Sequence, residues 1–311
     1  MNRLTVNALR AIEEEMHRLR RYQTVPLFYD PIDYMLDLGG KKIRPLLLWL
    51  SCGMCGASPE RALPAAAAVE LLHDFSLVHD DIMDNDATRR GKPTIHVKWD
   101  VNTAILSGDG LLGFAFQKLL ETDCDDTAEL ARVFTRAMII ICEGQGLDKQ
   151  FEEQEEVTPA AYLDMIRRKT ATLIEVSCEL GGMIAGADDA TLEQLRRFGL
   201  NLGMAFQMQD DMLDITADEA ALGKKVGSDF EMHKRTILYL MLRERLDKAV
   251  FDALDLAGYR RALNEAGILA AVQKQTEDYF DAAWRALEHF PASPYKSAVG
   301  EMLSSLQKRR Y

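Results

Sequence analysis

Apolar residues recur every three or four positions along most of the chain, which is the spacing of a helix with one buried face. The longest stretch with this pattern runs from residue 160 to residue 290 and contains no proline. Two of its segments, 161–186 and 192–215, keep the spacing over many turns. Each is therefore predicted to form a long helix.

The segment 57–80 predicts a further long helix, because Ser58 and Pro59 form a helix start signal ahead of an apolar run. The sequence TIHVKW, Thr94–Trp99, alternates like a strand but is too short to support a sheet. The fold class is accordingly all-α. We expect a single large helical domain over residues 1–311, with two half-domains as the alternative.

Chain length and net charge limit the kinds of protein and of partner that fit this sequence. A chain of 311 residues can bury a substantial core, and its net charge of -12 argues against a nucleic-acid partner. The N-terminal segment is amphipathic and charged rather than a signal peptide, and no segment has the 18 uninterrupted apolar residues that predict a transmembrane span. A cytoplasmic location is expected.

The cysteines do not suggest redox or metal chemistry. Cys52 and Cys55 have the spacing of a CxxC motif but follow a helix-like apolar run, and no second CxxC pair or nearby histidine completes a zinc site. We expect the five cysteines to be small buried residues in a reducing compartment.

Two acidic clusters with the same DDxxD spacing follow apolar helical runs. Their members are Asp80, Asp81 and Asp84 in the first cluster and Asp210, Asp211 and Asp214 in the second. Aspartates four apart share a helix face, where they repel by roughly 3 kcal/mol. Hard oxygen ligands without cysteine suit Mg(II), which often bridges to substrate phosphates.

Basic residues supply the opposite charge. The glycine-containing loop 39–45, GGKKIRP, carries Lys41, Lys42 and Arg44, and the segment 85–94, expected to be a loop, carries Arg89 and Arg90. A diphosphate bridged by magnesium would explain both signs of charge in one protein. A solvated acidic face is the alternative for the aspartates.

Five motifs in order along the chain resemble the trans-type isoprenyl diphosphate synthases, the polyprenyl synthetase family. They are GGKKIRP, HDDIMDNDATRRGKPT, RRKTATL, QMQDDMLD and LGKKVGSD, from residue 39 to residue 229. The resemblance implies an isoprenoid-synthase-type fold around a deep central cavity. It also implies that the six aspartates hold magnesium ions on the diphosphate of an allylic substrate.

The resemblance implies roles for further residues. Arg89 should contact the allylic diphosphate. Isopentenyl diphosphate should be held by Lys41, Arg44, His73 and Arg90. The residues that line the reacting carbons and the leaving group should be Lys169, Thr170, Gln207 and Lys224. Two further positions of the family, in the loop after the second cluster, match Asp229 and Lys234. The chain departs from the family at His233 and Leu238, where glycine and proline are usual.

The implied activity is prenyl transfer. Isopentenyl diphosphate would condense with dimethylallyl, geranyl or farnesyl diphosphate by ionisation, condensation and loss of a proton, with the departed diphosphate as the proton acceptor. A homodimer is expected from the resemblance, although a heteromeric arrangement stays open.

Product length is expected to depend on Phe75, five residues before Asp80, and on the small Ser76 beside it. Five residues of helix correspond to roughly 7.5 Å of depth. In relatives, an aromatic residue at this position goes with short products, so geranylgeranyl diphosphate is the hypothesis and farnesyl diphosphate the runner-up. Phe75 as a mere core residue is the alternative.

Other functions fit the sequence less well. The HD pair at His79 and Asp80 resembles metal phosphohydrolases, but the chain has six histidines in all and no evident further His–Asp set. A terpene cyclase usually lacks the second aspartate motif. A non-catalytic regulatory subunit would be expected to lose a cluster or its arginines, and this chain keeps both. Met204, Met208 and Met212 form a helical stripe that is expected to be core.

Overall fold

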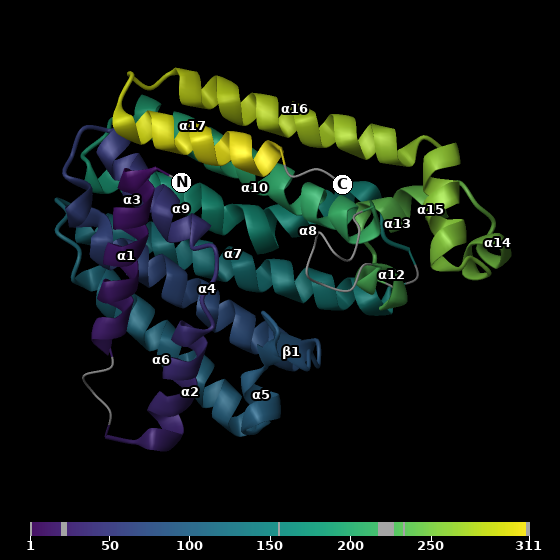
Figure 1. The fold of residues 1–311 in the computed structure, drawn as a ribbon, viewed down its shortest axis with the longest axis horizontal. Coiled ribbons are helices and arrows are strands. Elements are labelled where there is room, and N and C mark those ends of the chain that lie inside the picture. Colours follow the sequence, from purple (N-terminus) through teal and green to yellow (C-terminus); the bar gives the residue numbers. More distant parts are fainter. Residues whose placement is uncertain (1, 20–23, 155, 217–226, 233, 309–311) are drawn as a thin grey trace. The chain divides into compact units, whose positions relative to one another are not determined.

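The computed structural model describes residues 2–19, 24–154, 156–216, 227–232 and 234–308 (Figure 1). Over these residues the fold is helical apart from one two-stranded hairpin, which confirms the predicted fold class. The chain divides into two compact units. Unit 1 comprises residues 1–138, 176–196 and 290–299, and unit 2 comprises residues 139–175, 197–289 and 300–311.

Unit 1 contains the N-terminal helices and the hairpin. Its elements are α1 (Arg3–His17), α2 (Pro26–Asp37), α3 (Ile43–Met54), the 3-10 turn η2 (Pro59–Ala62), α4 (Leu63–Met83), β1 (Thr88–Arg89), β2 (Lys92–Pro93), α5 (Ile95–Lys98) and α6 (Val101–Leu120). Four of the five unit boundaries fall within helices, namely α7 (Thr127–Glu153), α9 (Thr172–Ile184), α10 (Asp189–Thr216) and α17 (Pro294–Gln307), and the fifth lies between residues 289 and 290.

Helix α4 lies at the centre of unit 1, where it packs against α1, α3 and, most extensively, α6 (Figure 1). Every residue from Ala65 to Leu72 is buried, because this half of the helix is apolar around nearly its whole circumference. Four successive alanines let the neighbouring helices approach closely. The start signal at Ser58 and Pro59 begins the 3-10 turn, and α4 itself begins at Leu63.

The strand-like alternation at Thr94–Trp99 does not correspond to a strand, because Ile95–Lys98 forms the short helix α5. The strands lie just upstream, in a segment that was expected to be a loop, and pair antiparallel as Thr88 with Pro93 and Arg89 with Lys92. Alternation over six residues was too short a signal to separate a strand from one helical turn.

Unit 2 contains the remaining helices. They are α8 (Pro159–Ile166), the π-helical segment η3 (Arg167–Ala171), α12 (Ser228–Glu231), α13 (Ile237–Arg243), α14 (Lys248–Asp252), α15 (Leu256–Glu265) and α16 (Ile268–Glu288). Met204, Met208 and Met212 are at most 4% exposed and belong to the apolar core of this unit, which confirms their predicted role.

The segment 161–186 was predicted to be one helix, but the π-helical segment η3 interrupts it between α8 and α9. The backbone N–H of Thr172 bonds to the carbonyl of Arg167. Such one-turn π segments are rare and are frequent at functional sites. This one carries Lys169 and Thr170.

The cysteine environments agree in part with the prediction. All five are thiols, and burial raises the pKa of Cys52 to about 12 and that of Cys55 to about 11, so neither is a reactive thiolate. Cys52 and Cys178 are buried as expected, whereas Cys142 is exposed.

Within the described residues, no helix is both long and apolar enough to cross a membrane.

Candidate active site

The first acidic cluster lies at the C-terminal end of α4, in unit 1. Asp80 and Asp84 share one face and are partly exposed, whereas Asp81 is only 3% exposed and points into the protein. Asn85 adopts a left-handed conformation with φ 52°, which ends the helix. Because the C-terminal end of a helix carries partial negative charge, three carboxylates there are unfavourable unless a cation offsets them.

Arg89 supplies part of that positive charge. Its Nε donates to Asp81 Oδ1 at 2.9 Å, its Nη2 donates to the same oxygen, and Nη2 lies 3.3 Å from Asp86 Oδ2. Burial raises the pKa of Asp81, and the Arg89 guanidinium opposes that rise. Asp81 is therefore a buried partner of Arg89, while Asp80 and Asp84 face outward.

The hairpin positions both arginines. Arg90 and Gly91 occupy its turn with φ of 53° and 74°, the conformation of a two-residue turn that favours glycine. Arg90 holds this left-handed conformation although it has a side chain, at a cost on the order of 1 kcal/mol. Its guanidinium donates to the carbonyl of Gly39, which ties the hairpin to the glycine-containing loop.

That loop presents its two lysines in opposite ways. Lys41 is exposed, whereas Lys42 begins α3 in a left-handed conformation with its side chain only 3% exposed. Lys42 Nζ lies 3.0 Å from Glu70 Oε1 on α4. Burial lowers the pKa of Lys42, but the carboxylates of Glu70 and Asp74 raise it by more. Lys42 therefore anchors the loop, and Lys41 is the lysine that solvent reaches.

Arg44 and His73 meet inside unit 1, with Arg44 Nη1 3.2 Å from His73 Nε2. A guanidinium can only donate, so Nε2 accepts and His73 carries its proton on Nδ1. Burial and then the positive charge of Arg44 lower the pKa of His73 well below its ordinary value. The histidine is a neutral polar group beside a partly buried cation.

Asp74 of α4, close to the charges of Lys42, Arg44 and Arg90, was not expected as a buried acid. It is fully buried, and neither carboxylate oxygen has a hydrogen-bond partner among the described residues. Burial raises its pKa to about 7, although Lys42, Arg90 and Arg44 pull it down. Helix spacing could have placed Glu70, His73 and Asp74 on one face of α4. The surrounding residues are apolar, however, and gave no reason to expect buried acidic side chains there.

The second acidic cluster, in unit 2, repeats the pattern of the first. It lies in the last two turns of α10, where Asp210 is exposed, Asp214 is partly exposed and Asp211 is 3% exposed. In each cluster the outer pair faces outward and the middle aspartate faces inward. Both clusters also stand at the helix end that disfavours anions.

Asp211 ends a chain of hydrogen bonds within unit 2. Its carboxylate accepts from the hydroxyl of Tyr162 at 2.5 Å and from Gln207 Nε2 at 2.9 Å, and the hydroxyl of Thr170 donates to Gln207 Oε1 at 3.0 Å. Burial raises the pKa of Asp211 well above its ordinary value, while these donors pull it down. Thr170 and Gln207, two of the four residues predicted to line the reacting carbons and the leaving group, are thus joined to the second cluster.

Lys169 lies on the π-helical segment and pairs with Asp148 of α7, Nζ to Oδ2 at 2.6 Å. The two helices approach closely because α7 carries Gly144 at this point. A methyl group there would lie 2.4 Å from the backbone nitrogen of Lys169 and 2.7 Å from its Cα. Gly144 and Asp148 together fix where Lys169 stands, and neither residue belongs to a motif that the sequence alone made visible.

The loop after the second cluster is described in part. The backbone N–H of Asp229 donates to Asp214 Oδ2 at 3.0 Å, and Lys234 is exposed. Lys224 and His233 lie outside the described residues. The backbone N–H of Gly227 also donates to the carbonyl of Asp214 at 2.7 Å, so this loop contacts the second cluster at Asp214 through two backbone groups.

The residues predicted to set product length lie on α4 in unit 1. Phe75 is half-buried, and its ring centroid lies 4.7 Å from that of His79, one turn nearer the aspartates. The hydroxyl of Ser76 donates to the carbonyl of His73 at 2.8 Å. Ser76 thus turns its polar atom back onto its own helix.

The chemistry of the acidic clusters fits an oxygen-ligated cation. Among the described residues, no group of three or more His, Cys, Asp or Glu side chains is gathered closely enough to hold a metal on its own. A cation bound at Asp80 and Asp84 would complete its coordination with water or ligand oxygens, as Mg(II) commonly does. The donor set therefore fits magnesium bound together with a phosphate-bearing ligand.

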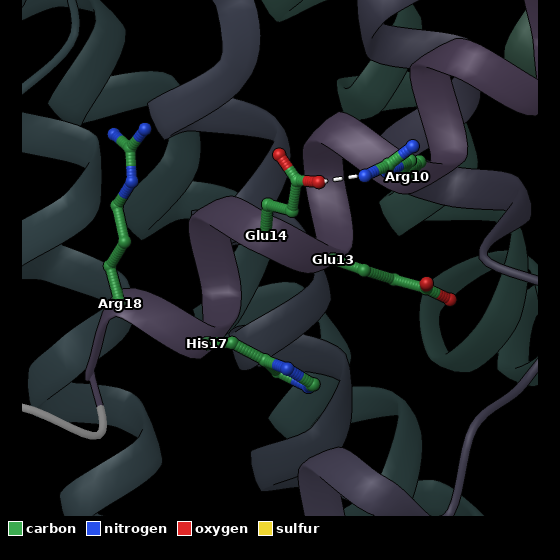
Figure 2. Close-up of a pocket in the computed structure, with 5 residues that line it drawn as sticks. All are labelled: Arg10, Glu13, Glu14, His17 and Arg18. Carbon is green, nitrogen blue, oxygen red and sulfur yellow. Dashed lines mark hydrogen bonds and ion pairs between the residues drawn. The ribbon is translucent and has the colours of Figure 1, made fainter.

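A cavity of about 370 Å³ on α1 contains none of these residues (Figure 2). It is lined by Arg10, Glu13, Glu14, His17 and Arg18, and Arg10 pairs with Glu14 one turn along the same helix. The side chains come from one exposed stretch of helix with mixed charge. We do not assign a function to this surface.

The fold and its two acidic clusters match a known class of helical enzymes. The family model described as polyprenyl synthetase matches residues 25–274. The geranylgeranyl diphosphate synthase of Sulfolobus acidocaldarius is 42% identical over 288 residues, covering 89% of this chain and 84% of that protein. The chain belongs to the polyprenyl synthetase family and is a prenyltransferase.

Solved structures agree with this assignment. A crystal structure of a geranylgeranyl pyrophosphate synthase superposes with a TM-score of 0.91 at 36% identity, covering 100% of both chains. A polyprenyl synthase from Caulobacter crescentus, described as a complex with calcium and isoprenyl diphosphate, gives a TM-score of 0.85 at 32% identity and covers 98% of this chain and 94% of that one. These relatives support the isoprenoid-synthase type of the predicted fold.

Proposed function

We propose that the protein condenses isopentenyl diphosphate with allylic diphosphates and releases geranylgeranyl diphosphate as its main product. The observation that carries the proposal is the pair of DDxxD clusters, each at the C-terminal end of a long helix and each with an outward-facing outer pair. The names of the relatives support the product. Farnesyl diphosphate, the runner-up, and a regulatory subunit are not favoured by any of these relatives.

Magnesium is the proposed cofactor, held by Asp80, Asp84, Asp210 and Asp214, with Asp81 and Asp211 behind them. When bound, it would neutralise the leaving diphosphate, which favours cleavage of the allylic carbon–oxygen bond. Support comes from the hard oxygen donors and from their position at helix ends that disfavour uncompensated negative charge. The calcium in the Caulobacter complex is a divalent cation of the same hard type.

The cationic surface of unit 1 is proposed to bind the substrate diphosphates. Lys41, Arg44, His73 and Arg90 would hold isopentenyl diphosphate, and Arg89 would reach the allylic diphosphate from the hairpin. Arg44 is oriented by His73, and Arg90 by the Gly39 carbonyl. Guanidinium groups suit this task because they donate paired hydrogen bonds to phosphate oxygens.

The reacting carbons are proposed to lie beside the π-helical segment. The Thr170 hydroxyl and the Gln207 amide would turn their dipoles toward the allylic cation, and Lys169 and Lys224 would hold the departing diphosphate. The hydrogen bond between Thr170 and Gln207 keeps both groups oriented before substrate binds. Lys234 would complete the cationic side of this region.

Phe75 is proposed as the floor of the product cavity, with Ser76 beside it. Phe75 lies on the helix that ends in the first aspartate cluster, roughly 7.5 Å along the helix axis from Asp80. Replacing Phe75 with alanine should lengthen the product. A product profile that does not change in this variant would place the floor elsewhere.

A homodimer in the cytoplasm is the proposed form of the enzyme. On one exposed stripe of α6, Val101, Ile105 and Leu106 are 46%, 42% and 51% exposed. An apolar stripe of this kind is typical of a surface that another chain covers. Light scattering of the purified protein should give twice the chain mass, and a monomer at micromolar concentration would contradict the dimer.

The reaction is tested with purified protein, labelled isopentenyl diphosphate, Mg(II) and, separately, dimethylallyl, geranyl or farnesyl diphosphate. Products separated by length should stop at twenty carbons with every starter. Asp80→Asn and Asp210→Asn should each lower kcat on the order of a hundredfold, a loss typical of removing a charge-stabilising group. The matched control Asp125→Asn, in the exposed loop before α7, should leave kcat unchanged. No elongation from folded, Mg(II)-binding protein would overturn the proposal.

A further inference from the structure

Helix α6 carries a glycine at the point where α4 presents His79. Gly108 is buried, and a methyl group on it would lie 2.2 Å from His79 Nε2 and 2.5 Å from His79 Cδ2. Real carbon atoms do not approach this closely, so the imidazole occupies a slot that only glycine leaves open. The next atoms around the ring also come from α6, with the carbonyl of Ile105 at 3.5 Å and Asp109 Oδ1 at 3.9 Å from Nε2.

The imidazole also packs against the ring of Phe75. The two residues are four apart on α4, so they share a helix face, and their ring centroids lie 4.7 Å apart with an interplanar angle of 60°. The His79 ring therefore contacts both α6, at Gly108, and the Phe75 ring. One glycine on α6 thereby limits the position of an aromatic side chain on α4.

We infer that Gly108 and His79 are specificity-determining residues, which hold the Phe75 ring in place and so help to set product length. This inference rests on the proposed function, in which Phe75 closes the cavity. His79 acts here as a positioning residue through its ring, and no proton transfer is involved. Removing the imidazole opens space beside Phe75, so the ring can retreat and a longer chain can pass.

Product length is the direct readout of this inference. His79→Ala should raise the ratio of longer products to the native product on the order of tenfold. A factor of this size is what an apolar pocket gains or loses when its size changes by about one methylene group. Gly108→Ala should also change the ratio, because its methyl group expels the imidazole. The double variant should match His79→Ala, since without the ring the new methyl group has nothing to displace.

Controls separate this effect from general damage. Gly113→Ala lies on the same helix and has no atom within 4 Å of the new methyl group, so its product ratio should stay native. The Mg(II) concentration for half-maximal rate should change less than about twofold in His79→Ala, which shows that the neighbouring Asp80 still binds. Circular dichroism confirms that each variant is folded.

Each outcome distinguishes the inference from the proposed function. If the native chain makes no prenyl product, the proposed function fails. If the native chain is active but His79→Ala keeps its product ratio, the positioning role fails while the function stands. If Gly108→Ala changes the ratio equally with and without the imidazole, Gly108 acts on product length by another route and the inference is wrong.

Discussion

The buried carboxyl group of Asp74 should make the protein less stable as the pH rises. In the folded chain its pKa is raised from 3.8 to about 7, chiefly by burial. Between these two values the unfolded chain releases the proton while the folded chain keeps it, so stability falls across this window. An asparagine side chain cannot ionise, and Asp74→Asn should therefore remove this dependence.

The magnitude follows from the two pKa values. Each pH unit between the folded and unfolded pKa corresponds to about 1.4 kcal/mol, so the full effect of Asp74 is about 4 kcal/mol. Roughly 2 to 3 kcal/mol of it should appear between about pH 5 and pH 8. The charged groups that act on the carboxyl are Lys42, Arg44 and Arg90, together with Glu70 on its own helix.

Urea denaturation at several pH values between about 5 and 8 measures this difference. The free energy of unfolding of Asp74→Asn should gain on that of the native chain steadily as the pH rises. Asp125→Asn, at an exposed position, is the control and should run parallel to the native chain. If the curves of the native chain and Asp74→Asn also stay parallel, Asp74 does not titrate in this window and the reasoning is wrong.

Two further substitutions test close packing and buried hydrogen bonding in unit 2. Gly144→Ala should lower the free energy of unfolding by about 1 to 3 kcal/mol and lower kcat, because its methyl group meets the Lys169 backbone. Gly146→Ala, where the methyl group meets open space, is the control and should raise the free energy of unfolding by up to about 1 kcal/mol. Equal urea midpoints for the two variants would contradict the close approach at Gly144. Tyr162→Phe should cost about 1 to 3 kcal/mol, because Asp211 loses a hydrogen-bond donor while buried, and an unchanged midpoint would contradict this role.

Local sequence patterns predicted much of the helical structure. Apolar spacing located the long helices because a helix on the surface of a core must bury one face. The same spacing predicted that Asp80 and Asp84 face the same way, as do Asp210 and Asp214. Where the pattern was short, as at Thr94–Trp99, the alternation did not indicate the structure, because a few residues fit a strand and a helical turn equally well.

Neighbours distant in the sequence could not be predicted in the same way. The sequence placed Lys41 and Lys42 side by side, but only the packing of α3 on α4 buries Lys42 against Glu70 and leaves Lys41 exposed. The π-helical segment also escaped prediction, because its side chains follow the same apolar spacing as an α-helix. Its backbone approaches Gly144 of α7 so closely that a methyl group would not fit there.

The sequence by itself determined the all-helical class, the two aspartate clusters and the family, because these depend on residue types at fixed short spacings. Tertiary structure alone decided which aspartates turn inward, with Asp81 paired to Arg89 and Asp211 to Tyr162. It also decided that His79 fills the slot at Gly108. The physical reason is that a helix pattern specifies which side chains share a face, whereas their partners are specified by helices that come together only when the chain folds.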